Sequence, residues 1–295
     1  MFGVISENPI YLVIIALIGA MIFVAKINEK FFASFKLIYV RGLMSITLYS
    51  LAGGVALKLF LPEHSLLLRS SIAFLVCFLI QTVFYWIIIS LEYDGDSAST
   101  MFLKFKESVI SWSAQKRHIE LKSQMEREGF KQSGAFETSL DEDISSAMYL
   151  FSFDSTDNLT RMLITFLPIG NASYMMSSVE SLLKDGTKII TESGCVFTGL
   201  LEPTNCDIKQ VAFQTNPLKL LKIHKRRLAK KTIEQIQVEP DILSDINKTV
   251  DDSVATNIKY GVINPPSLWN EYGLLTSDGK YRMWSAMIRS YYFPF

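Results

Sequence analysis

Three long apolar runs in the first third of the chain constrain its fold more than any other feature. The first, Pro9 to Ala25, contains no charged residue over 17 positions. As an α-helix it would be about 26 Å long, close to the lower limit for a hydrocarbon core of roughly 30 Å. Two further runs, Leu37 to Leu61 and Leu66 to Leu91, carry charges only near their ends.

Backbone polar groups within lipid must be satisfied by the segment itself, so the three runs predict three transmembrane helices in residues 1–92. The first reads as a retained anchor, because no Lys or Arg precedes it and no cleavage site of small residues follows before Lys26. Composition agrees: 49% of residues are hydrophobic and 20% charged, whereas soluble domains have roughly 25% charged residues.

The distribution of basic residues predicts the orientation in a cell (inner) membrane. The N-terminal tail has none, whereas the segments after the first and third spans contain Lys26, Lys30, Lys36 and Arg41, and Lys104, Lys106, Lys116 and Arg117. The positive-inside rule then places the N-terminus outside and the C-terminal region in the cytoplasm. Three cysteines without close spacing do not form a disulfide framework, which fits a reducing compartment.

The spans contain few polar groups. Gly53 and Gly54 allow close helix packing, either inside a three-helix bundle, which we favour, or at an interface between copies of the chain. Gln81, in the middle of the third span, is expected to hydrogen-bond a neighbouring helix. No Asp, Glu or His lies at mid-membrane and no inverted repeat is present, which argues against a transporter.

Residues 93–129 are expected to form a linker and an amphipathic stalk helix, capped by Ser99 or Thr100 and ending before Gly129. The prediction depends on apolar residues that recur at helical spacing: Phe102, Phe105, Val109, Trp112 and Ile119.

Residues 130–295 predict a cytoplasmic α+β domain with a mostly antiparallel sheet. Lys184-Asp185-Gly186 is typical of a hairpin turn. The expected strands are Ala147 to Phe153, Arg161 to Leu167, Tyr174 to Leu183, Thr187 to Thr191 and, more weakly, Ile208 to Phe213.

A basic amphipathic helix is expected after Asn216-Pro217. Its seven cations are Lys219, Lys222, Lys225, Arg226, Arg227, Lys230 and Lys231, with no acidic residue among them. Such a helix packs its leucines and solvates its lysines, and it can also contact anionic lipid or an acidic partner. Membrane lipid is the expected partner beside a possible homo-oligomer or membrane-protein partner. Nucleic acid is disfavoured, because Lys+Arg and Asp+Glu both number 29.

The remaining C-terminal region is acidic and then aromatic. A helix is expected between Pro240 and Tyr260, and its acidic residues could face the basic helix, either inside the domain or between neighbouring subunits. Aromatic residues crowd the end of the chain, where they suit core packing, the membrane interface or a partner groove. The interface candidates are Trp284, Tyr291, Tyr292, Phe293 and Phe295.

No catalytic or nucleotide-binding motif is present, and no metal or cofactor is expected. Asp154 and Asp157 fit a polar turn, and Cys195 has no adjacent base. The sequence therefore predicts a non-enzymatic, membrane-anchored binding, sensing or scaffold protein. The chief alternative is an oligomeric membrane effector whose cytoplasmic domain senses a signal and whose spans permeabilise the bilayer. A membrane-bound enzyme using Asp154, Asp157 or Cys195 is a distant third possibility.

Overall fold

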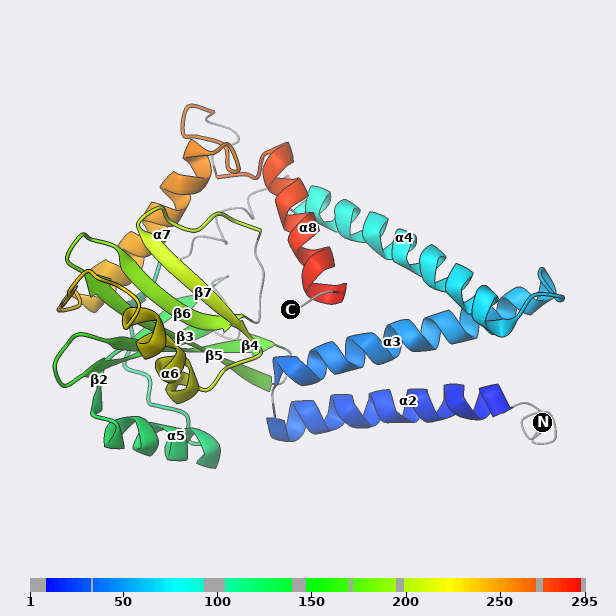
Figure 1. The fold of residues 1–295 in the computed structure, drawn as a ribbon, viewed down its shortest axis with the longest axis horizontal. Coiled ribbons are helices and arrows are strands. Elements are labelled where there is room, and N and C mark those ends of the chain that lie inside the picture. Colours follow the sequence, from blue (N-terminus) through cyan, green and yellow to red (C-terminus); the bar gives the residue numbers. More distant parts are fainter. Residues whose placement is uncertain are drawn as a thin grey trace. The chain divides into compact units, whose positions relative to one another are not determined.

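The computed structural model describes residues 9–32, 34–92, 104–139, 147–169, 172–194, 199–268 and 273–292 (Figure 1). The chain divides into two compact units. The helical unit contains the described residues up to Ser90 and those from Trp284 onward, and the sheet unit runs from Leu91 to Met283.

The helical unit is built on the three apolar runs. They form α2 (Pro9–Ile27), α3 (Phe35–Ala56) and α4 (Leu66–Glu92). A π-helical turn (Asn28–Phe32) follows α2, and a 3-10 turn (Leu57–Leu59) extends α3. All three helices are long and apolar enough to cross a membrane, and few of their residues are buried inside the unit. The prediction of three apolar helices is confirmed.

Small residues allow α3 and α4 to cross closely. A Cβ atom on Gly53 would lie 2.7 Å from the Cβ atom of Ala73, and one on Gly54 would lie 2.3 Å from Ser70 Oγ. Any larger residue at either glycine would push the two helices apart. The expected packing role of these glycines within the helical unit is thus confirmed.

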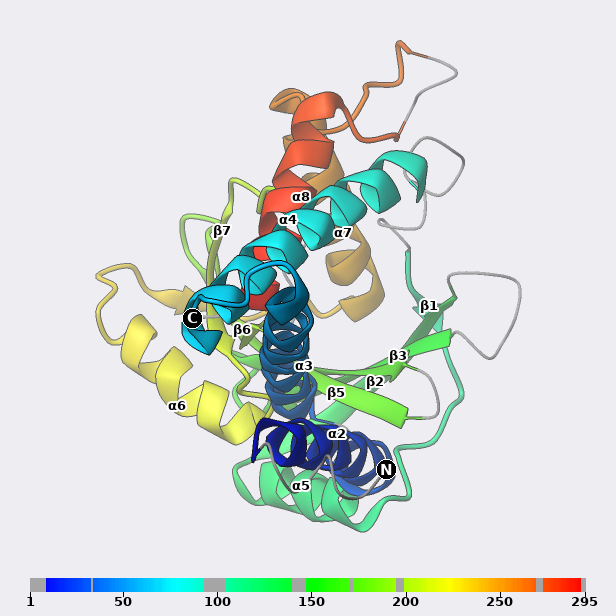
Figure 2. The same ribbon diagram turned by 90° about the vertical axis from the view of Figure 1, so that its right-hand side faces the viewer.

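The fourth helix of the helical unit comes from the other end of the chain. α8 (Ser277–Tyr292) contains the boundary between the two units, and its second half crosses α4 (Figure 2). The aromatic C-terminal region therefore includes a helix, which the sequence analysis did not predict.

The sheet unit contains eight strands in the order β1-β2-β3-β4-β5-β6-β7, with β8 paired to β5. Neighbouring strands pair antiparallel, except that β6 and β7 are parallel, so the predicted mostly antiparallel sheet is confirmed. The strands are β1 (Lys106–Glu107), β2 (Phe130–Ser139), β3 (Ala147–Ser155), β4 (Arg161–Ile169), β5 (Ala172–Leu183), β6 (Lys188–Gly194), β7 (Cys206–Ala212) and β8 (Gln235–Ile236).

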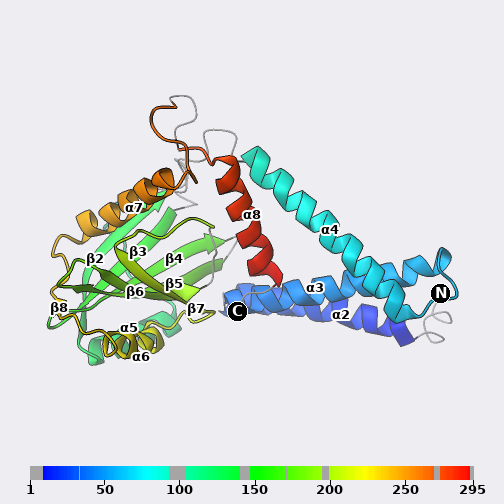
Figure 3. The same ribbon diagram turned by 45° about the horizontal axis from the view of Figure 1, so that its top comes forward.

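Helices cover both faces of this sheet (Figure 3). α5 (Lys116–Arg127) and α6 (Pro217–Leu228) lie on one face, and α7 (Ile242–Lys259) lies on the other. The core beneath α5 and α6 is apolar and includes Leu121, Met125, Phe151, Phe153, Ile164, Val179, Leu220 and Leu221.

The predicted stalk helix is wrong for residues 104–115, which contain the short strand β1 and no helix; its first part, 93–103, lies outside the described residues. Tertiary contacts explain the difference. The Asn247 side chain hydrogen-bonds the backbone N–H and C=O of Phe105, at 2.9 and 3.0 Å, and so holds this segment against α7. Trp112 packs edge-on against Phe151, with ring centroids 5.0 Å apart. Phe105 and Trp112 matched a helical spacing without lying in a helix.

The acidic segment forms a helix as predicted, but its expected pairing with the basic helix within one chain is wrong. α7 lies on the opposite face of the sheet from α6 (Figure 3). Its acidic residues contact other partners: Asp251 pairs with Lys104 at 2.9 Å, and Asp245 pairs with strand residues.

Candidate functional site

The basic helix is fixed firmly at its N-terminus. The Asn216 side chain accepts hydrogen bonds from the backbone N–H groups of Leu218 and Lys219, at 3.0 and 3.3 Å. Pro217 stands in the first turn, where its missing N–H costs no hydrogen bond. Leu220 and Leu221 are buried against the sheet. These contacts fix which side of α6 packs on the sheet and which side faces away from it.

The seven cations of this segment divide into two groups. Arg227 and Lys231 bind Asp207 of β7, with nitrogen–oxygen distances of 2.6 and 2.7 Å. The hydrogen bond from Lys231 lowers the pKa of Asp207, helped by Arg227. Arg227 also donates to Thr191 Oγ1 at 2.8 Å and to the carbonyl oxygen of Ile190. These two cations therefore attach the helix to the sheet.

The other five cations are exposed and form what we call the basic face: Lys219, Lys222, Lys225, Arg226 and Lys230. Lys219, Lys222 and Arg226 are spaced three and four residues apart and share one side of α6, which Lys225 flanks. Lys230 lies in the turn that follows the helix. No residue in the described part of the chain forms an ion pair with any of the five. The basic face is thus exposed positive charge without an ion-pair partner among the described residues, although Lys225 is near enough to Asp157 to help lower the pKa of that carboxyl.

His224 lies on the inner side of α6 and is fully buried. Its two ring nitrogens lie 3.0 Å from Thr191 Oγ1 and 3.1 Å from Ser181 Oγ. Burial, reinforced by the nearby charge of Arg227, lowers the pKa of His224 to about 4. The ring is therefore neutral at physiological pH and adds no charge to the basic face.

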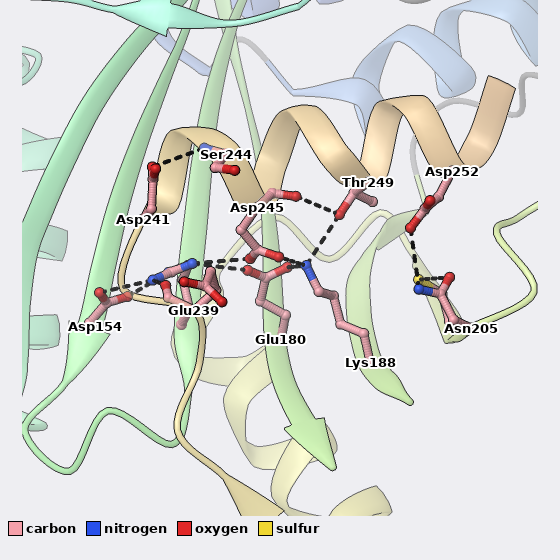
Figure 4. A network of polar contacts seen from close by, with 12 residues as sticks. Asp154, Glu180, Lys188, Asn205, Glu239, Asp241, Ser244, Asp245, Thr249 and Asp252 are labelled. Atoms are coloured by element: carbon pink, nitrogen blue, oxygen red, sulfur yellow. Dashed lines mark hydrogen bonds and ion pairs between the residues drawn. The ribbon is translucent and has the colours of Figure 1, made fainter. Parts of the chain in front are cut away.

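A set of ionisable side chains lies largely buried between the sheet and α7. We call it the charge network: Asp154, Arg161, Glu180, Lys188 and Asp245. Figure 4 shows the side chains of Asp154, Glu180, Lys188 and Asp245 directed toward one another from β3, β5, β6 and α7.

Arg161 of β4 is fully buried and connects the network. Its Nε lies 2.8 Å from Asp154 Oδ1 and its Nη1 lies 3.1 Å from Asp245 Oδ2. Its Nη2 donates to the carbonyl oxygen of Glu239 at 2.7 Å. Burial alone would lower the pKa of Arg161, but the adjacent carboxylates outweigh it and raise the pKa.

Glu180 is the poorly paired member of the network. Lys188 Nζ lies 2.7 Å from Asp245 Oδ1 but 3.8 Å from Glu180 Oε2. Glu180 Oε1 accepts no hydrogen bond in the described part of the chain, and Arg161 Nη1 is 4.0 Å away. Burial raises the pKa of Glu180, against the opposing effect of Lys188. Two cations face three carboxyl groups, so the network is electrically balanced when Glu180 holds a proton.

Asp154 and Asp157, which the sequence offered as catalytic candidates, take part in contacts that hold the fold together. Asp154 belongs to the charge network. Asp157 accepts hydrogen bonds from Ser155 Oγ (2.6 Å) and the backbone N–H of Leu159 (3.1 Å), as in a polar turn. Burial raises the pKa of Cys206 to about 11, which makes its thiol a poor nucleophile. Cys195 lies outside the described residues. Within the described ranges, no cluster of His, Cys, Asp or Glu is arranged to hold a metal ion.

The C-terminal aromatic residues contact α4. Trp284 Nε1 donates to the carbonyl oxygen of Thr82 at 2.9 Å, and its ring lies edge-on to Trp86. The Tyr292 hydroxyl donates to Gln81 Oε1 at 2.5 Å. The neighbouring helix expected for Gln81 is therefore α8. Phe293, Phe295 and the side chain of Tyr291 lie outside the described part of the structure.

Comparison with protein-family models, curated proteins and solved structures finds no match to this chain.

Proposed function

We propose that this chain is a membrane-anchored binding protein whose sheet unit binds anionic lipid headgroups through the basic face of α6. In this proposal α2, α3 and α4 span the cell (inner) membrane. The observation that carries the proposal is the division of the basic segment. Two cations attach α6 to β7, and five exposed cations form no ion pair with a described residue.

The energetics suit an anchored domain. A basic residue close to an anionic membrane surface contributes about 1 kcal/mol. Three or four residues of the basic face acting together would contribute about 3–4 kcal/mol by that estimate. Such a contact is weak for a free protein, but the spans raise the effective concentration of the surface and make it sufficient to orient the sheet unit.

The proposed orientation has the N-terminus outside and the sheet unit in the cytoplasm, as the basic residues favour. In this arrangement the basic face meets the negatively charged cytoplasmic leaflet. Fusions at Phe295 test it in a bacterial host: a fluorescent protein should fluoresce and alkaline phosphatase should be inactive. An active phosphatase would reverse the orientation.

The proposal also gives α8 a sensing role. This helix begins in the sheet unit and ends on α4, so a change in the sheet unit reaches a membrane helix through continuous backbone. A protein that served only as a scaffold would need the membrane anchor but not this link between the sheet unit and α4.

Lysine footprinting tests the lipid contact on the full-length protein. The protein is reconstituted into nanodiscs of neutral lipid or of neutral lipid mixed with anionic phosphatidylglycerol, and acetylation of each lysine is followed by mass spectrometry. We expect Lys219, Lys222 and Lys230 to react several-fold more slowly in anionic nanodiscs. High salt should restore the reaction, because it screens exposed charges.

Two controls accompany this measurement. Exposed Lys116 and Lys131, on other elements of the sheet unit, should react equally in both nanodiscs. Replacing Lys219, Lys222 and Arg226 by Gln should abolish the protection of Lys230. Equal reactivity of the basic face in both lipids would refute the lipid contact, and protection only by added nucleic acid would assign the face to that partner.

A further inference from the structure

A cavity of about 300 Å³ lies in the helical unit between α3, α4 and the end of α8. Its walls are mainly apolar and include Ile46 of α3, Phe74, Cys77, Phe78 and Gln81 of α4, and Tyr292 of α8.

The polar groups at its edge are already satisfied. Gln81 uses both ends of its amide within the protein: its Oε1 accepts from the Tyr292 hydroxyl at 2.5 Å, and its Nε2 donates to Tyr85 Oη at 3.0 Å. A ligand is therefore not needed to satisfy this amide. The cavity suits an occupant that makes apolar contacts only.

The position and size of the cavity indicate which occupant this is. Its α4 residues lie between Phe74 and Phe84, in the middle of a helix that runs from Leu66 to Glu92 and is long enough to cross a membrane. The surrounding medium at that level is hydrocarbon. A water molecule takes roughly 30 Å³ and a methylene group a similar volume, so there is room for about ten carbon atoms of an acyl chain.

One wall of this cavity is formed by Tyr292, which belongs to α8. Its ring lies edge-on to Phe78, with centroids 5.0 Å apart, so the wall exists only while α8 is docked on α4. A ligand that binds the docked form better than the undocked form stabilises docking by the same free energy.

We propose that the acyl chain of a membrane lipid occupies this cavity and that its binding stabilises the docking of α8 on α4. The inference rests on the membrane anchoring proposed above, but not on the lipid contact of the basic face. It adds an intramembrane lipid site, of which the C-terminal helix is a part.

Photocrosslinking tests this inference on the full-length protein. The probe is phosphatidylcholine with a diazirine in the middle of one acyl chain, incorporated into nanodiscs, and adducts are mapped by mass spectrometry. We expect adducts at Ile46 and Phe78 about fivefold above those at Leu79 and Val83, the ratio given by a preference of about 1 kcal/mol. Leu79 and Val83 are exposed residues of α4 that do not line the cavity.

Two matched variants separate a site from ordinary surrounding lipid. Cys77→Phe fills the cavity and should reduce adducts at Ile46 and Phe78 to the level of Leu79. Val83→Phe adds a ring of the same size outside the cavity and should leave the pattern unchanged. Tyr292→Ala should abolish the enrichment at Phe78 while adducts at Leu79 persist, which also shows that the protein remains inserted.

Each outcome decides one part of the inference. Equal labelling of Ile46, Phe78, Leu79 and Val83 in the native protein would overturn the site. Enrichment that survives Tyr292→Ala would overturn the coupling to α8. A protein without adducts at any of these residues would overturn the membrane anchoring and the site together.

Discussion

Among individual residues, Glu180 is the one whose surroundings most clearly predict how stability depends on pH. The other two carboxyl groups of the charge network each have an ion-pair contact of 2.8 Å or less, whereas the nearest cation to Glu180 is 3.8 Å away. Burial raises the pKa of Glu180. Between the unfolded value, about 4.3, and the raised native value, the folded protein holds a proton that the unfolded chain has released. The free energy of unfolding then falls as pH rises through this window.

Glu180→Gln keeps the shape of the protonated side chain and removes the titration. We expect thermal unfolding of the full-length protein in detergent to show a melting-temperature gain for the Gln variant that grows as pH rises above the unfolded pKa of about 4.3. A difference that is constant with pH would show that Glu180 does not titrate there. Comparing the two proteins at each pH cancels contributions from other groups, such as His224.

Asp245→Asn serves as the contrasting change in the same network. It weakens the counter-charge of both Arg161 and Lys188, and a broken buried ion pair costs about 3–5 kcal/mol. We therefore expect strong destabilisation of the sheet unit, measured as loss of near-ultraviolet circular dichroism at lower temperature. If Asp245→Asn did not lower the melting temperature relative to Glu180→Gln, Asp245 would not be the ionised partner of Arg161 and Lys188 that we infer.

At the scale of elements, two substitutions in residues 104–115 test whether this segment, which precedes α5, is non-helical, as in the structure, or forms the helix that its sequence pattern predicts. Trp112 packs against Phe151, Phe153 and Phe166, whereas Val109 is fully exposed. Trp112→Ala should cost about 3–5 kcal/mol and Val109→Ala within about 0.5 kcal/mol, measured by chemical unfolding. Similar costs at the two positions would favour the amphipathic helix that the sequence predicts.

Elements with a strong local pattern could be predicted from the sequence. The three apolar runs indicated α2 to α4, alternating apolar residues indicated β3 to β6, and Asn216-Pro217 marked the start of α6. β2 was not predicted, because its register shifts between Gln132 and Gly134 and so interrupts the alternation.

The sites were harder to predict, because they depend on contacts distant in sequence. Arg161, Glu180 and Lys188 stood in or beside expected strands, where a charged residue usually indicates the solvent side. The cover provided by α7 changes that meaning, and nothing local reveals it. Gln81 and Tyr292 are 211 positions apart. By contrast, the cations of α6 were visible as a run, although the sequence could not separate the two that bind Asp207 from the five exposed ones.

At the scale of the whole molecule, α8 belongs to both units. Trp284→Ala removes a ring contact and a hydrogen bond to α4. A loss of about 1.4 kcal/mol would speed amide hydrogen exchange about tenfold in residues 284–292. Residues 277–283 should exchange as before, because their contacts are within the sheet unit. Uniform acceleration along α8 would show that the helix opens as one piece.

The same helix makes the helical unit discontinuous along the chain, which has a consequence during biosynthesis. Residues Leu91 to Met283 must be made after α4 and before Trp284 emerges. At about 5–20 residues per second, this takes on the order of ten seconds or more. During that interval Gln81 has no Tyr292 to bind, and the sheet unit can complete its own folding first. A ribosome stalled before the last turn of α8 would thus carry a folded sheet unit beside an unfinished helical unit.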